Sequence, residues 1–168
     1  MILLVVPVFV SACAVESAPA TNSSWDVAFR QAADEPTPAS WARPEKWTFE
    51  IRGPEGEDLG LISLEFTDEP VDSCTTETAL RARFIDSTTS IAPLEVWYGG
   101  EDAVTYPAYE ITGATVFLTL NANICDANYN LAGTLSDSGA EGTVRGEGLA
   151  GLDEIGTFEA RHYEGSGR

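Results

Sequence analysis

Few residues in this chain have the types and spacing that catalysis requires. His162 is the single histidine, no candidate nucleophile stands near it in the sequence, and the Gly-x-Ser-x-Gly pattern of serine hydrolases is absent. Paired carboxylates perform glycoside hydrolysis, but with 27 acidic residues chance pairs are certain and carry no signal. The sequence therefore predicts no catalytic residue, no enzymatic activity and no cofactor.

Residues 146–151 read Gly-Glu-Gly-Leu-Ala-Gly, which matches the pattern of a dinucleotide-binding fingerprint. That fingerprint works only between a parallel strand and a helix, in a unit of about thirty residues. Here a strand-like pattern resumes at Thr157. We therefore expect a glycine-rich hairpin turn.

Aromatic side chains supply the candidate ligand-binding residues. Trp97, Tyr98, Tyr106 and Tyr109 are able to line a cup for a sugar or a small apolar ligand. The alternative is that these rings fill strand faces, as aromatic residues commonly do in sheets.

The chain is strongly acidic, because 27 Asp and Glu against nine Lys and Arg give a formal net charge of −18. Such a surface repels nucleic acid, which is excluded as a partner. Three interpretations remain: a solvated surface suited to high salt, a cationic partner, or calcium. The acidic residues are spread along the chain and cluster in predicted turns, and the EF-hand pattern is absent. The solvated surface is favoured, and no metal site is predicted.

The chain opens with a short apolar run that ends in Val10-Ser11-Ala12-Cys13. The run is about a dozen residues, shorter than the roughly 20 that a membrane-spanning helix needs. Its ending resembles the lipobox of bacterial lipoproteins, although residues 1–12 lack the Lys or Arg of the usual leader. The resemblance implies that residues 1–12 are a signal peptide and that Cys13 is lipidated and anchors the protein to a membrane. Because Ala14 rather than Asp follows, it also implies the outer membrane of the cell envelope, with the protein facing the periplasm or the surface.

Lipidation of Cys13 leaves Cys74 and Cys125 as an even pair in an oxidising compartment, where a disulfide is the simple interpretation. A zinc site is the alternative, but zinc takes about four Cys, His or carboxylate ligands. With His162 as the single histidine, we expect the disulfide.

Residues 13–45 are rich in Ala, Ser, Pro and Thr and show no sustained period, which is typical of a spacer. Residues 24–33 within it have the pattern of a short helix, with Trp25 and Phe29 one turn apart. We expect a lipid-anchored linker over 13–45, a β-domain over 46–164 and a disordered tail over 165–168.

From Trp47 the hydrophobic pattern has a period of two, which predicts strands with one buried face. The predicted strands are short, with a bulge near Ile62, and they occupy residues 47–52, 59–66, 80–84, 94–98, 106–112, 114–124, 129–135, 142–147 and 157–163. Eight or nine strands with short connections indicate an all-β, antiparallel, up-and-down arrangement. Closure removes exposed edges, so we expect a barrel of about eight strands, with a β-sandwich as the alternative.

Trp47 at the start of the first strand and Arg161 in the last resemble the Trp and Arg that pair at the closed end of lipocalin and avidin type (calycin-like) barrels. Glu45 departs from the pattern, because those families usually have Gly there. An interior of this size holds packed side chains or one small ligand.

Two functions are compatible with a lipid-anchored, acidic β-barrel. The first is a non-enzymatic, membrane-anchored module that binds a small apolar or sugar ligand near the aromatic residues above. The second is an envelope interaction protein, for example an inhibitor of a cationic enzyme such as lysozyme, because an acidic surface attracts basic partners.

Overall fold

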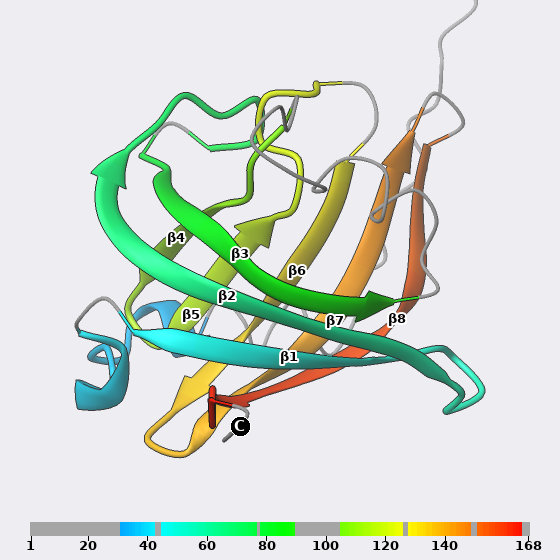
Figure 1. Ribbon diagram of the computed structural model, residues 1–168. Helices are drawn as coiled ribbons and strands as arrows, with labels where there is room; N and C mark the ends of the chain where they lie inside the picture. Colours follow the sequence, from blue (N-terminus) through cyan, green and yellow to red (C-terminus); the bar gives the residue numbers. More distant parts are fainter. Residues whose placement is uncertain are drawn as a thin grey trace, which may run out of the picture.

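The computed structural model describes residues 31–42, 45–76, 78–89, 105–125, 128–148 and 151–165. Within them eight strands form a closed barrel (Figure 1). The strands are β1 (Lys46–Arg52), β2 (Asp58–Pro70), β3 (Leu80–Thr89), β4 (Ala108–Thr112), β5 (Thr115–Thr119), β6 (Asn128–Ser136), β7 (Gly139–Gly148) and β8 (Gly151–His162). The predicted leader, Cys13, the strand at 94–98 with Trp97 and Tyr98, and residues 24–30 of the predicted helix lie outside the described residues.

Each strand pairs antiparallel with the next in sequence, and β8 pairs with β1 to close the ring. The predicted up-and-down barrel is thus confirmed, and the sandwich alternative is wrong. The glycine-rich segment at 146–151 joins β7 to β8, with Gly148 paired to Gly151, so the hairpin interpretation is also confirmed.

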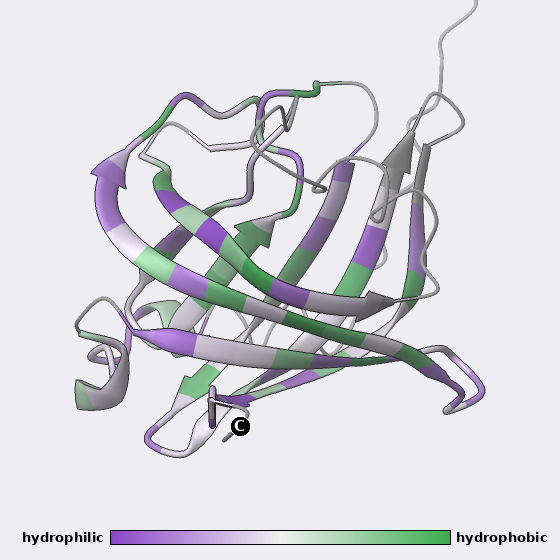
Figure 2. Ribbon diagram, in the orientation of Figure 1, coloured by the Kyte–Doolittle hydropathy of each residue, from purple (hydrophilic) through white to green (hydrophobic). Residues whose placement is uncertain are grey.

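Alternation of apolar and polar residues is clear in β1, which buries Trp47, Phe49 and Ile51 and leaves the residues between them partly exposed. Figure 2 shows hydrophobic and hydrophilic residues alternating along β2 and β3. All eight strands contribute buried apolar side chains to one cluster. The large side chains among them, in order along the chain, are Trp47, Phe49, Ile51, Ile62, Leu64, Phe66, Tyr109, Val116, Leu118, Leu131, Leu135, Val144 and Phe158. Side chains therefore occupy the described part of the interior, as expected at this strand number.

The irregularity predicted near Ile62 is present in the pairing of β2 with β3, where the register shifts between Ser63 and Leu64. Ile62, Leu64 and Phe66 keep one phase and are all buried. A second shift, which the sequence did not predict, lies at Leu59, because Gly60 pairs with Ile51 while Asp58 pairs with Arg52.

Residues 31–42, which the composition assigned to the linker, pack against one end of the barrel. Trp41, in the short 3-10 helix η1 (Ala39–Trp41), is buried and donates its indole N–H to the Ser136 carbonyl at 3.0 Å. Gly113 has φ +58°, and a Cβ there would lie 2.2 Å from the Ala33 carbonyl oxygen. This close approach requires glycine, so the ordered domain includes residues before 46.

Trp47 lies in an aromatic stack at this same end. Its ring stacks on Trp41 with centroids 3.6 Å apart and on His162 at 4.0 Å. The expected pairing with Arg161 is absent from the described residues, because Arg161 pairs with Thr48 and is exposed on the opposite face of the sheet. Glu45, the departure from the barrel families, contacts His162 Nδ1 at 3.0 Å.

Candidate functional site

The four predicted ligand-binding aromatic residues do not form one described pocket. Tyr109 belongs to the core, where its ring stacks on Phe66 at 4.0 Å and its hydroxyl donates to the Thr67 carbonyl at 2.6 Å. Burial, with a smaller contribution from Asp68, raises the pKa of Tyr109 to about 12. Tyr106 packs in a separate small cluster, and Trp97 and Tyr98 lie outside the described ranges. The predicted aromatic cup stays a prediction.

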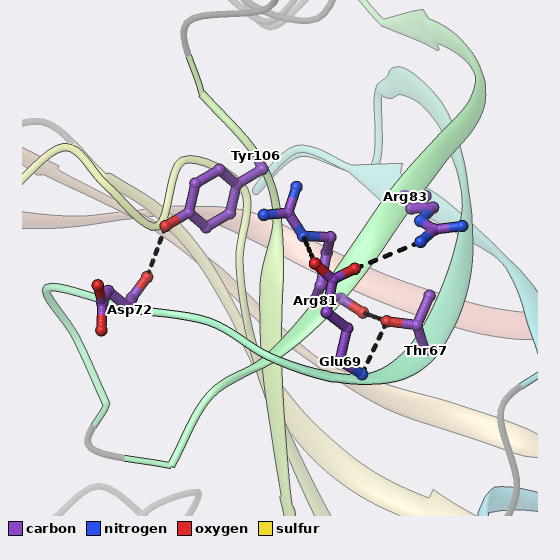
Figure 3. A network of polar contacts seen from close by, with 6 residues as sticks. All are labelled: Thr67, Glu69, Asp72, Arg81, Arg83 and Tyr106. Carbon is purple, nitrogen blue, oxygen red and sulfur yellow. Dashed lines mark hydrogen bonds and ion pairs between the residues drawn. The ribbon is translucent and has the colours of Figure 1, made fainter.

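Tyr106 belongs to a polar network that fixes the chain after β2 (Figure 3). The Arg81 guanidinium lies over the Tyr106 ring, 4.5 Å from its centroid, and the Tyr106 hydroxyl donates to the Asp72 carbonyl at 2.9 Å. Glu69 faces both Arg81 and Arg83, with N to O distances of 3.4 and 3.3 Å. One face of the Tyr106 ring is thus covered by the Arg81 guanidinium, and the Tyr106 hydroxyl is hydrogen-bonded to the backbone of Asp72.

This network places the segment 71–76 beside the connection from β5 to β6. The Cys74 amide donates to the Ala122 carbonyl at 2.8 Å, and the Ala122 amide donates to the Tyr106 carbonyl at 2.9 Å. Cys74 and Cys125 form the predicted disulfide, with a Cα to Cα distance of 5.1 Å. The disulfide confirms the cysteine pairing and holds the two segments together.

A hollow of about 410 Å³ lies where this cross-linked segment meets the outer face of β5, β6 and β7. We call it the asparagine cleft. Its lining residues are Cys74, Thr75, Phe117, Cys125, Asn128, Asn130, Ala132 and Arg145. A volume of this order falls within the range of small-molecule sites.

The cleft contains polar atoms that the fold leaves unsatisfied. Asn128 is 2% exposed and Asn130 is 6% exposed, and neither Oδ1 atom has a hydrogen-bond partner. Thr119, directly opposite Asn130 on β5, is 1% exposed, and its Oγ1 also lacks a partner. Each such buried group costs about 1–3 kcal/mol. These three groups lie on one face of two neighbouring strands, β5 and β6, and folding alone does not favour such an arrangement.

Asn121, at the end of β5, shows the contrasting case. It is fully buried, and its Oδ1 accepts a hydrogen bond from the Tyr129 amide at 3.0 Å. The fold therefore satisfies a buried asparagine where it acts structurally. Asn128 and Asn130, whose Oδ1 atoms have no partner, instead line the cleft.

The lining of the cleft combines polar and apolar groups. Amide oxygens accept hydrogen bonds, and the Phe117 ring and Ala132 offer apolar surface. Within the described residues, no group of three or more Cys, His, Asp or Glu is placed to hold a metal ion. The sequence carried no motif for this site. Polar residues on β6 that alternate with apolar ones look like ordinary solvent-facing positions, and the structure shows instead that they are buried.

Comparison with known proteins finds no matching family model, no matching curated protein and no matching solved structure. In the described ranges, no helix is long and apolar enough to cross a membrane.

Proposed function

We propose that this protein is a non-enzymatic binding module whose ligand is a small, neutral sugar or polyol held in the asparagine cleft. The observation that carries the proposal is that Asn128 and Asn130 both line a hollow of about 410 Å³ and that the amide oxygen of each is buried without a hydrogen-bond partner. These oxygens need hydrogen-bond donors, and sugar hydroxyls supply several in fixed positions. The C–H face of a sugar ring fits the apolar surface of Phe117.

The packed interior favours a ligand site on the outside of the barrel rather than a site for an apolar ligand inside it. Buried side chains from every strand meet in one cluster. An apolar ligand would have to displace them, whereas a polar ligand in the cleft satisfies atoms that are otherwise unpaired. Of the two ligand types expected from the sequence, the sugar is therefore the one proposed.

Thermal-shift titration with neutral sugars and polyols tests this function. A ligand at ten times its dissociation constant stabilises the native state by about 1.4 kcal/mol, which raises the midpoint by roughly 3–6 °C for a chain of this size. Asn130→Leu should abolish the shift. Asn123→Leu is the matched control, because Asn123 lies nearby in the connection from β5 to β6 and does not line the cleft.

The proposal fails if no neutral sugar or polyol shifts the midpoint, or if Asn130→Leu leaves the shift unchanged. It also fails if a high-resolution crystal structure shows ordered water on both amide oxygens and sugar soaks displace none of it. In that case water alone satisfies the cleft.

We also propose that Cys13 anchors this module to a bacterial membrane through lipid. The support is the lipobox resemblance, together with a Cys74–Cys125 disulfide that fits an oxidising compartment. Mass spectrometry of membrane-extracted protein should show a chain that begins at an acylated Cys13. An unmodified Cys13 thiol would contradict the anchor without affecting the cleft.

A further inference from the structure

Three carboxylates lie directly opposite one another on the outer face of β1, β8 and β7. Glu50 pairs with Glu159 across β1 and β8, and Glu159 pairs with Glu141 across β8 and β7. Directly opposed side chains in antiparallel strands have Cβ atoms about 4.5–5.5 Å apart, and like charges there are destabilising. We call Glu50, Glu159 and Glu141 the carboxylate row.

The negative charge of the carboxylate row is neutralised by a basic side chain at one end only, among the described residues. Arg52 forms an ion pair with Glu50. Among the described residues, no ion pair joins a basic side chain to Glu141 or Glu159, and both are exposed. Arg161 lies two residues from Glu159 on the same face of β8 without pairing with it. The excess negative charge is therefore concentrated at Glu159 and Glu141.

Two hollows flank these two carboxylates. One, of about 340 Å³, is lined by Thr134, Glu141, Gly142, Thr143, Thr157, Phe158 and Glu159. The other, of about 300 Å³, shares Thr134, Glu141 and Glu159 with it. Neither lining contains a basic residue, and neither shares a residue with the asparagine cleft.

A second, independent feature points to a ligand in the larger hollow. Thr143 lines the same hollow as both carboxylates and is 7% exposed, and its Oγ1 is buried without a hydrogen-bond partner. A hydrogen-bond donor that carries positive charge would satisfy the Thr143 hydroxyl and relieve the repulsion between Glu141 and Glu159. A metal ion is not indicated, because no described group of three acidic or metal-binding side chains is placed to hold one.

We propose that this face is a docking site for a basic protein segment that inserts an arginine side chain between Glu141 and Glu159. Arginine fits better than lysine because its planar fork presents several donors and can bridge two carboxylates while it reaches Thr143. This site is separate from the proposed sugar site, so either can fail without the other. It gives the acidic chain a defined place to engage a cationic partner.

A labelled tetra-arginine peptide tests the site against the full chain by microscale thermophoresis, with tetra-lysine as the second arm. Two double variants remove the same charge: E141Q/E159Q changes the row, and E55Q/E164Q changes exposed carboxylates elsewhere. We expect E141Q/E159Q to weaken binding of tetra-arginine at least tenfold and E55Q/E164Q less than threefold. Thr143→Val, which keeps the carboxylates, should weaken it about threefold or more.

Equal weakening by the two double variants would show that net charge alone attracts the peptide, and it would overturn the proposal. Absence of binding at low salt, tetra-lysine binding as tightly as tetra-arginine, or unchanged affinity in Thr143→Val would also overturn it.

Thermal unfolding of the free variants provides a second readout. Glu159→Gln should raise the midpoint, because it removes the repulsion on both sides of β8; a lowered midpoint would mean that the row is compensated in the free protein and would contradict the premise.

Discussion

Replacing Asn130 by leucine should make the free protein more stable. The Asn130 side chain is 6% exposed, and its Oδ1 is buried without a partner. Leucine is close to asparagine in size and shape, so the substitution removes the polar group without opening a cavity. Because an unsatisfied buried polar group costs about 1–3 kcal/mol, the free energy of unfolding should rise by roughly that amount. The better fit of leucine to a strand adds to this gain.

Chemical unfolding in urea measures this change directly, and differential scanning calorimetry checks it as a rise of roughly 2–4 °C for each kcal/mol. Asn121→Leu is the matched control, because it removes the acceptor of the Tyr129 amide and leaves that amide unsatisfied. The control should lose about 1–3 kcal/mol. The two substitutions have the same chemistry and opposite expected signs.

The reasoning is refuted if Asn130→Leu destabilises the protein as much as Asn121→Leu does. That result would mean that the Asn130 side chain is already satisfied in the free protein, so that no ligand is needed to complete it. A stabilised Asn130→Leu that also loses sugar binding would show that the site sacrifices stability for function.

Three further predictions concern the scaffold. Replacing both Cys74 and Cys125 by serine opens a loop of 51 residues and should lower the free energy of unfolding by about 4 kcal/mol in urea; a loss below about 1 kcal/mol would show that the disulfide does not constrain the unfolded chain. Because burial and Asp68 raise the pKa of Tyr109 to about 12 while an unfolded tyrosine titrates near 10, the stabilising contribution of Tyr109 is complete below pH 10 and is lost as the pH rises toward 12. Ultraviolet titration should therefore show one tyrosine that ionises together with unfolding, and its ionisation near pH 10 in the folded protein would be the contrary outcome. Trp41→Ala should lower the free energy of unfolding by about 3–5 kcal/mol by calorimetry, as for other buried aromatic residues. A negligible loss would mean that the packing of residues 31–42 against the end of the barrel does not stabilise the protein.

The period-two pattern was sufficient to predict the barrel. Trp47, Phe49 and Ile51 alternate with polar residues, and the structure buries all three. The register shift near Ile62 was predicted, but the second shift, at Leu59 opposite β1, was not. Leu59 and Leu61 are apolar but only partly buried, so hydrophobicity alone did not show that second change of register. Trp41 was assigned to a linker because the proline-rich composition around it is typical of a spacer. Its partner Ser136 lies far away in the sequence, so its burial could not be predicted from its neighbours.

The candidate site depended on information that a single sequence does not carry. Cys74 and Cys125 were paired by count, but their spacing does not show that the disulfide holds residues 71–76 beside the connection from β5 to β6. Asn128 and Asn130 are polar residues that alternate with Tyr129 and Leu131, a pattern that normally marks solvent-facing positions. Their burial follows from tertiary contacts, and so does the alignment of Glu50, Glu159 and Glu141, which requires the register of three strands.

The side-chain amide resonances of Asn128 and Asn130 offer the most direct test of the proposed binding site. Two-dimensional nitrogen-proton NMR of the labelled chain, titrated with neutral sugars and polyols, should show saturable shifts of both amides for at least one compound, while the Asn121 amide stays fixed. If no compound in the panel moves either amide at concentrations up to the millimolar range, the asparagine cleft is not a sugar site.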